Sequence, residues 1–158
     1  MGREITAEVT NMIMIQDPQT KKVVVLNRRL SWKGISFPGG HVEKNESFYE
    51  SAVREAYEET GLRVRDLRFC GVINWECVED GSRYIVMLYK TDKYEGELKP
   101  GTEEGENFFV DIEELKNRKT DNHIEDYLPL FLDDNIFESY EKYSKTNDEK
   151  FPVAYFGK

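Results

Sequence analysis

Residues 40–62 read Gly40-His-Val-Glu-Lys-Asn-Glu46-Ser-Phe-Tyr-Glu-Ser-Ala-Val-Arg54-Glu55-Ala-Tyr-Glu58-Glu59-Thr-Gly61-Leu62. The stretch follows directly on Pro38 and Gly39, so a glycine loop precedes a run of glutamates with one arginine among them. A packed apolar core does not need so much negative charge in one place. Carboxylates that hold a divalent metal ion beside a polyphosphate would account for it.

The two ends of a helix can be recognised inside this stretch. Ser47 and Glu50 form a capping-box pattern and Gly61 is a typical residue just beyond a helix, which predicts a helix over residues 48–60. At about 100° per residue, one side of this helix is an apolar stripe that is predicted to face a sheet. The stripe consists of Tyr49, Ala52, Val53 and Ala56, and the adjacent arc carries Glu55, Glu58 and Glu59.

The position of these glutamates favours a metal site over a solvated acidic surface. Glu55 and Glu59 are a like-charge i,i+4 pair, which costs about 0.2–0.5 kcal/mol in isolation and more beside a buried seam. A solvated helix face would explain scattered glutamates but not the glycine loop in front of them. Carboxylate oxygens, a backbone carbonyl, waters and phosphate oxygens would complete the shell of Mg²⁺. Arg54 can reach Glu46 or Glu58 as an orienting partner, or it is an exposed pair with Glu58.

The composition indicates one globular domain over residues 1–158. The net charge of −9 argues against partners such as nucleic acid polymers or anionic membranes, although bound cations can reverse the local sign for a nucleotide. No apolar run approaches a membrane span and no signal-peptide pattern is present, so a cytoplasmic location is the default expectation. Cys70 and Cys77 lack metal-ligand spacing and are expected to be reduced cysteines in or near a strand.

The rest of the chain alternates predicted strands with a few helices. Strands are predicted over residues 9–15, 23–26, 69–78, 84–91 and 108–110. Helices are predicted from residue 111, over residues 124–132 and over residues 137–143, the last within a helical or extended tail over about 133–158. The first two strands are expected to form a hairpin, and the strand over residues 84–91, apolar on both faces, is expected to be central. This order indicates an α/β sandwich with a mixed sheet.

Residues 40–62 resemble, position for position, the signature of the Nudix hydrolases. The matching positions are Gly40, Glu46, Arg54, Glu55, Ala56, Glu58, Glu59, Gly61 and Leu62, and Ala56 alone is smaller than the usual residue. The resemblance implies a Nudix-type α/β/α sandwich with a mixed β-sheet. It implies hydrolysis of a nucleoside diphosphate linked to another group. The metal ligands that it implies are Gly40, Glu55, Glu58 and Glu59, holding Mg²⁺ with Mn²⁺ as a possible substitute.

Catalytic roles follow from the same resemblance. The reaction needs a carboxylate that accepts a proton from the attacking water, and in the family this base is the glutamate equivalent to Glu55 or one on a later loop. Glu103, Glu104 and Glu106 supply the later loop here; we favour Glu104, and at least two of the three are expected to be solvated turn residues. The predicted catalytic residues are Glu55, Glu58, Glu104 and Arg54.

Substrate choice lies outside this signature. The segments around Asn11, Trp32 and residues 36–43 are similar in texture to bacterial MutT/MutX-type 8-oxo-dGTP diphosphatases. The predicted substrate-binding residues are Arg28, Gly39, Trp75, Tyr84 and Asn122. Arg28 would contact phosphate or base, and Asn122 would read the purine edge or else cap a helix. Trp75 and Tyr84 would stack on the base, with Asn11 beside them, or else simply pack.

Three functions are therefore open. The first is a nucleotide-pool sanitising hydrolase that converts 8-oxo-dGTP to its monophosphate and pyrophosphate, in support of DNA repair. The second is a Nudix pyrophosphatase for ADP-ribose, a sugar nucleotide, a diadenosine polyphosphate or ordinary (d)NTPs. The third is a nucleotide sensor without turnover, which is disfavoured because every carboxylate of the signature is present. Either a monomer or a homodimer is compatible with each function.

Overall fold

The computed structural model describes residues 2–30, 32–117, 120 and 122–158 of the chain. The helices that it describes are α1 (Phe48–Thr60), α2 (Ile112–Asn117) and α3 (Ile124–Leu132). The strands that it describes are β1 (Ala7–Ile15), β2 (Val23–Arg28), β3 (Gly34–Ser36), β4 (Arg63–Arg65), β5 (Arg68–Cys77), β6 (Arg83–Thr91), β7 (Lys93–Glu95), β8 (Gly101–Thr102), β9 (Gly105–Val110), β10 (Ile136–Tyr143) and β11 (Ala154–Gly157).

The larger sheet is mixed, with the strand order β1-β6-β5-β10-β11. Strand β6 runs parallel to β1 and antiparallel to β5, and β10 runs parallel to β5. A second sheet has the order β3-β2-β9-β8, and β4 pairs with β7. The central position predicted for the strand over residues 84–91 is confirmed, because β6 lies between β1 and β5.

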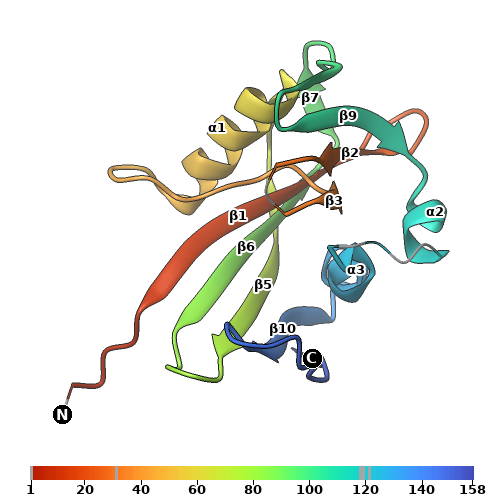
Figure 1. The fold of residues 1–158 in the computed structure, drawn as a ribbon. Helices are drawn as coiled ribbons and strands as arrows, with labels where there is room; N and C mark the ends of the chain where they lie inside the picture. The colour runs from red at the N-terminus through yellow and green to blue at the C-terminus, as the bar shows by residue number, and fades with distance from the viewer. Residues whose placement is uncertain (1, 31, 118–119, 121) are drawn as a thin grey trace.

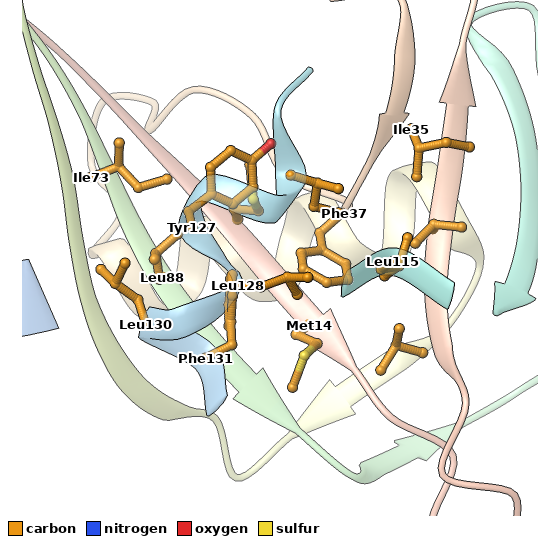
Figure 2. Packing of buried hydrophobic residues seen from close by; sticks show 14 of the residues in the cluster. Met14, Ile35, Phe37, Ile73, Leu88, Leu115, Tyr127, Leu128, Leu130 and Phe131 are labelled. Atoms are coloured by element: carbon orange, nitrogen blue, oxygen red, sulfur yellow. The ribbon is translucent and has the colours of Figure 1, made fainter. Parts of the chain in front are cut away.

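Alternation along β1 divides the core into two layers. Met12 and Met14 belong to the cluster that packs under α3, whereas Ile13 and Ile15 belong to the cluster that packs under α1. Successive residues of a strand point to opposite faces, so an unbroken apolar run needs cover on both sides. Figure 1 shows α1 on one side of the β1-β6-β5 strands and α3 on the other, and Figure 2 shows Phe131, Leu128 and Tyr127 of α3 packed near Phe37. The predicted α/β/α sandwich with a mixed sheet is confirmed.

Helix α1 forms where its caps predict it. The Ser47 hydroxyl accepts a hydrogen bond from the Glu50 amide and the Glu50 carboxylate accepts one from the Ser47 amide, while Gly61 adopts φ 77°. Ala52 and Ala56 are fully buried against the sheet. The predicted stripe is wrong only in Tyr49, which is 41% exposed and touches Tyr89 edge-on.

The hairpin predicted from the first two strands is wrong. β1 pairs with β6 in the large sheet, whereas β2 pairs with β3 and β9 in the smaller one. A single bridge, between Gln16 and Val23, joins the two strands near their turn. A turn with an apolar run on either side does not reveal which sheet each run enters.

The helix predicted over residues 137–143 is also wrong, because this segment is the strand β10. Phe137, Tyr140 and Tyr143 recur every third residue, a spacing that is also compatible with a helix. Strand β10 instead pairs with β5 on one side and with β11 on the other. The final segment, which the sequence left open between a helical and an extended tail, contains β11 and forms an edge of the large sheet.

Two smaller expectations can be compared with the fold. Cys70 and Cys77 both lie on β5 with free thiols, as predicted. Among the helices described, none combines the length and the apolar character that crossing a membrane would require.

Candidate active site

The glycine loop before α1 lies directly on β1. The amide of Asn11 donates to the Gly40 carbonyl at 2.9 Å, and the amide of Ile13 donates to the Pro38 carbonyl at 2.8 Å. A Cβ atom at Gly39 would stand 2.1 Å from the Asn11 carbonyl oxygen, so only glycine fits there. A Cβ atom at Gly40 would stand 2.5 Å from the carboxyl carbon of Glu55. Two predicted metal ligands, Gly40 and Glu55, are therefore in direct contact.

Arg54 orients the carboxylates around it. Its guanidinium donates to both oxygens of Glu46, at 3.0 and 2.8 Å. It also donates to Glu55 Oε1 at 2.9 Å, to Glu58 Oε2 at 3.1 Å and to the His41 carbonyl at 3.0 Å. The hydrogen bond from Arg54 holds the pKa of the Glu46 carboxyl well below its usual range. The orienting geometry expected for Arg54 is present, and it extends to Glu55 as well as to Glu46 and Glu58.

Glu59 is the most buried carboxylate of the cluster. Its side chain is 11% exposed and accepts hydrogen bonds from Arg28 Nη2 at 3.0 Å and from the Gly39 amide at 2.8 Å. Burial nevertheless raises the pKa of Glu59 to about 7, with Arg28 and the Gly39 amide opposing the rise and Glu55 adding to it. Burial also raises the pKa of Glu55. Both carboxyls lie where additional positive charge would stabilise the ionised form.

The donors at this position fit a hard cation. They are oxygens only: the carboxylates of Glu55, Glu58 and Glu59 and the carbonyl of Gly40, which keeps a second lone pair beyond its bond to Asn11. All three carboxylates form ion pairs with arginines, and Glu58, at 56% exposure, is the most exposed of them. Within the described part of the chain, no three acidic, histidine or cysteine groups converge as a preformed metal site. Binding of Mg²⁺ would therefore require Glu55 and Glu59 to turn from Arg54 and Arg28 toward the ion.

Arg28, predicted to contact phosphate or base, lies beside Gly39 and Glu59. We call this part of the site, formed by the glycine loop and the glutamates of α1, the catalytic end. The Arg28 guanidinium reaches Ser36 Oγ at 2.8 Å and the Gly39 carbonyl at 3.4 Å in addition to Glu59. Strand β2 brings it there by pairing with β3, which leads into the glycine loop. This position, beside the predicted metal ligands, favours contact with phosphate over contact with the base.

An aromatic groove extends from the glycine loop across the sheet. A cavity of about 320 Å³ is lined at one end by Asn11, Arg28, Gly39 and Gly40 and at the other by aromatic rings. These rings are Trp32, Trp75 and Tyr84, whose centroids lie 5.4–5.7 Å apart in each pair. The same three rings line a second cavity of about 490 Å³ that continues to Asn122, His123 and Glu141. Trp75 and Tyr84, the predicted pair, therefore share one cavity with Asn122 and the other with the glycine loop.

Asn122 is not the helix cap that was its alternative interpretation. The N-cap position of α3 is His123, and the Ile124 amide donates to Thr120 Oγ1 at 3.0 Å. Asn122 donates its Nδ2 to the Trp32 carbonyl at 2.7 Å and to the Ile35 carbonyl at 3.4 Å. Its amide group thus ties the Trp32 loop to the start of α3 at the wall of the second cavity.

Glu104 and His41 lie at the margins of the site. Glu104 is exposed in the turn between β8 and β9, where its carbonyl accepts a hydrogen bond from the Arg29 amide. No interaction in the described part of the chain links its carboxylate to Glu55 or Glu59, so its role as the base stays a prediction. The His41 side chain is 65% exposed and lies 3.2 Å from Glu8.

Sequence reasoning did not assign two residues of the groove. In the sequence, Trp32 stands out only as part of a segment similar to MutT/MutX-type proteins. In the structure its backbone has a left-handed φ of 52°, which indicates a constrained position. Glu141 carries no usable signal, because the segment that contains it was interpreted as a helix. That Glu141 lies next to Trp75 is known only from the pairing of β10 with β5.

Comparison with known proteins decides the family. The NUDIX domain pattern matches residues 7–131 of the chain, which is most of its length. The chain belongs to the Nudix hydrolase family. A Nudix hydrolase of this kind is an enzyme that cleaves pyrophosphate linkages in nucleotides.

Individual relatives of this Nudix hydrolase differ in substrate. An ADP-ribose pyrophosphatase of Methanocaldococcus jannaschii is 32% identical over 111 residues, which is 68% of this chain and 66% of that protein. An oxidized purine nucleoside triphosphate hydrolase of Danio rerio is 26% identical over 142 residues, 87% of this chain and 88% of that protein. The crystal structure of a MutT protein from Bacillus halodurans has a TM-score of 0.74 at 21% identity, covering 92% of this chain and 97% of that one, and shows the shared fold.

Proposed function

We propose that this Nudix hydrolase converts oxidised purine nucleoside triphosphates, 8-oxo-dGTP in particular, to the nucleoside monophosphate and pyrophosphate. The observation that carries the proposal is the continuous groove between the glycine loop and the three rings of Trp32, Trp75 and Tyr84. A base is a flat apolar body with a polar edge, and aromatic faces bind any base by stacking. The groove has room for a base at one end and for phosphates at the other.

The catalytic end would bind the triphosphate chain through positive groups on a rigid frame. A bound Mg²⁺ or Mn²⁺ would neutralise phosphate oxygens and lower the pKa of a water molecule. Gly40, Glu55, Glu58 and Glu59 would hold it, and Arg54, anchored by Glu46, would orient Glu58 once Glu55 has turned to the ion. Arg28, released from Glu59, would contact a phosphate oxygen.

The reaction itself needs a base and an oriented water. The oxygen of the water forms a bond to the α- or the β-phosphorus, the P–O bond that bridges these two atoms breaks, and the group on the far side of that bond leaves with the electron pair. The proton of the water passes to a carboxylate. Glu55, which contacts Gly40 and has a raised pKa, and Glu104, on its exposed turn, are the two candidates for that carboxylate.

The base end would select the oxidised purine. Oxidation of guanine at C8 converts N7 from an acceptor into an N–H donor. Asn122 directs Nδ2 to the carbonyls of Trp32 and Ile35, and in the described residues no donor is recorded for its Oδ1. An oxygen of this kind would accept the N7–H of an 8-oxopurine and would face a lone pair on an unmodified one. The hydrolase of Danio rerio that matches most of this chain is named for the same substrate class.

The test is a side-by-side comparison of kcat/KM for 8-oxo-dGTP, dGTP and ADP-ribose with Mg²⁺, with released pyrophosphate and AMP identified. The proposal expects 8-oxo-dGTP to be the best substrate of the three. A clear preference for ADP-ribose would instead support the second candidate function, that of an ADP-ribose pyrophosphatase. The similarity to the Methanocaldococcus ADP-ribose pyrophosphatase favours this alternative. Binding without turnover of any nucleotide would favour the sensor.

A further inference from the structure

The large sheet carries a row of paired residues that crosses four strands. Glu8 on β1 is the register partner of Tyr84 on β6, Tyr84 is the partner of Trp75 on β5, and Trp75 is the partner of Glu141 on β10. Register partners on neighbouring strands point to the same face of a sheet. The row therefore begins beside the glycine loop, where Glu8 contacts His41, and ends at the carboxylate of Glu141.

The distance along this row matches a base. Neighbouring strands lie about 4.8 Å apart, so Tyr84 on β6 and Glu141 on β10 are separated by roughly 10 Å across the sheet. Trp32 stands over the row from its own loop, with its ring centroid 5.4 Å from that of Trp75 and 5.7 Å from that of Tyr84. A purine stacked on these rings would turn one edge toward Glu141 and another toward Asn122, since both residues line the cavity of about 490 Å³.

Glu141 is a half-buried carboxylate whose pKa His123 and Lys150 lower through charge, although neither is close enough to form an ion pair with it. Its Oε2 accepts the indole N–H of Trp75 at 3.2 Å, and it forms no ion pair with any residue that the structure describes. Burial raises the pKa of Glu141, while the hydrogen bond from Trp75 lowers it. The indole N–H fixes the direction of the carboxylate. Because none of the described residues donates a hydrogen bond to Oε1, this oxygen and the remaining lone pairs of Oε2 can accept further donors.

We propose that Glu141 is the residue that selects guanine-type bases in this groove. The Watson–Crick edge of guanine and of 8-oxoguanine offers two neighbouring donors, the N1–H and the 2-amino group, and a carboxylate accepts both. Adenine offers a lone pair at N1 in that position, which a carboxylate repels, and hypoxanthine lacks the 2-amino donor. The proposal rests on the proposed function for the base end of the groove, and it adds the contact that reads the edge opposite to the oxidised one.

Glu141→Gln is the informative variant. Glutamine keeps the shape of the side chain but presents one acceptor and one donor, a pattern that complements adenine better than guanine. Glu138→Gln is the matched control, since Glu138 lies on the same strand, accepts a hydrogen bond from Asn74 at 3.2 Å and is absent from the lining of both cavities of the groove. Neither variant touches the carboxylates of α1.

Two readouts test the proposal. The first is kcat/KM for dGTP, dITP and dATP with Mg²⁺, and the second is the binding of GMP, IMP and AMP without metal, followed by the fluorescence of Trp32 and Trp75. We expect the wild-type protein and Glu138→Gln to prefer guanine over the other two bases by about tenfold or more, as a two-point contact with a base edge gives. In Glu141→Gln the guanine preference should fall by at least about tenfold, mainly through KM and the dissociation constant.

Retention of the full guanine preference in Glu141→Gln would overturn the inference, as would a wild-type protein that binds GMP, IMP and AMP equally. The proposed function is tested by a different ratio, that of kcat/KM for 8-oxo-dGTP to kcat/KM for dGTP. A guanine preference that depends on Glu141, without any preference for the oxidised base, would therefore contradict the proposed substrate and support Glu141. The reverse result would support the substrate and contradict Glu141.

Discussion

The two ends of the groove are assembled in different ways. The residues of the catalytic end come mostly from one loop and the helix that follows it: Gly39, Gly40, Arg54, Glu55 and Glu59. Arg28 alone comes from another element, β2. The base end takes one residue from each of several distant segments, namely Trp32, Trp75, Tyr84, Asn122 and Glu141. The first is therefore specified by local spacing, and the second by how strands pair.

This difference separates chemistry from selectivity. The carboxylates of α1 contact a glycine loop that immediately precedes the same helix and that the amides of Asn11 and Ile13 hold against β1. The base end depends on the register of β6, β5 and β10, and a change in these strands can alter the rings without touching the carboxylates. We expect substitutions at the two ends to affect different kinetic constants.

The largest effect is expected for Glu59→Gln at the catalytic end. Removal of this charge should lower kcat/KM at least about 1,000-fold, equivalent to about 4 kcal/mol. The reason is that the variant lacks a carboxylate that would bind the metal ion, while the base end stays intact. Steady-state kinetics with circular dichroism would test it. Glu50→Gln is the control, since glutamine still completes the capping box on the same helix. Near-normal turnover by Glu59→Gln would remove Glu59 from the metal site.

The next effect is the pH dependence of stability in the metal-free protein. Glu59 has a pKa of about 7 when folded, raised by burial from 4.5, so between these values the folded state binds more protons than the unfolded one. The free energy of unfolding should therefore fall as the pH rises from about 4.5 through 7, by up to about 3 kcal/mol. Mg²⁺ at pH 8 should reverse the loss.

Denaturant titrations at pH 5 and pH 8, each with EDTA or with Mg²⁺, measure this dependence. Glu59→Gln supplies the comparison, because it lacks the titrating group. If the variant shows the same pH slope as the wild-type protein, the slope does not come from Glu59 and its link to metal uptake is wrong.

Trp75→Ala should show the opposite kinetic pattern at the base end. Loss of one stacking surface costs about 1–3 kcal/mol per base, so KM should rise by about 10- to 100-fold while kcat changes little. Phe69→Ala is a suitable control, since Phe69 lies on the same strand, is 54% exposed and does not line the groove. A fall in kcat at constant KM would contradict the division into two ends.

The smallest effect is expected for Ser47→Ala, which removes the helix cap without touching the groove. Loss of the hydroxyl that accepts the Glu50 amide should cost about 1 kcal/mol and lower Tm by about 2–4 °C. Calorimetry and kinetics on the same sample would test it. A loss of activity without a loss of stability would show that the cap acts on the site directly.

The same division explains what could be predicted from the sequence. The bounds of α1, its caps, and the contacts of Arg54 with Glu46 and Glu58 follow from spacing along a single segment, and the structure agrees with each. The helix predicted over residues 137–143 and the hairpin of the first two strands were wrong, because strand pairing is a tertiary choice that spacing does not encode. Glu141 was missed for that reason. The choice between phosphate and base for Arg28 stayed open in the sequence, because it depends on the pairing of β2 with β3.

In the function that we propose, one groove binds phosphates at the α1 end and an oxidised purine at the aromatic end. A crystal structure with Mg²⁺ and a non-hydrolysable analogue of 8-oxo-dGTP tests it most directly. We predict the ion bound by Gly40, Glu55 and Glu59, and the base stacked on Trp75 and Tyr84 with its edges toward Asn122 and Glu141. An analogue whose base lies outside the aromatic cavity, or an ion bound away from α1, would contradict the account.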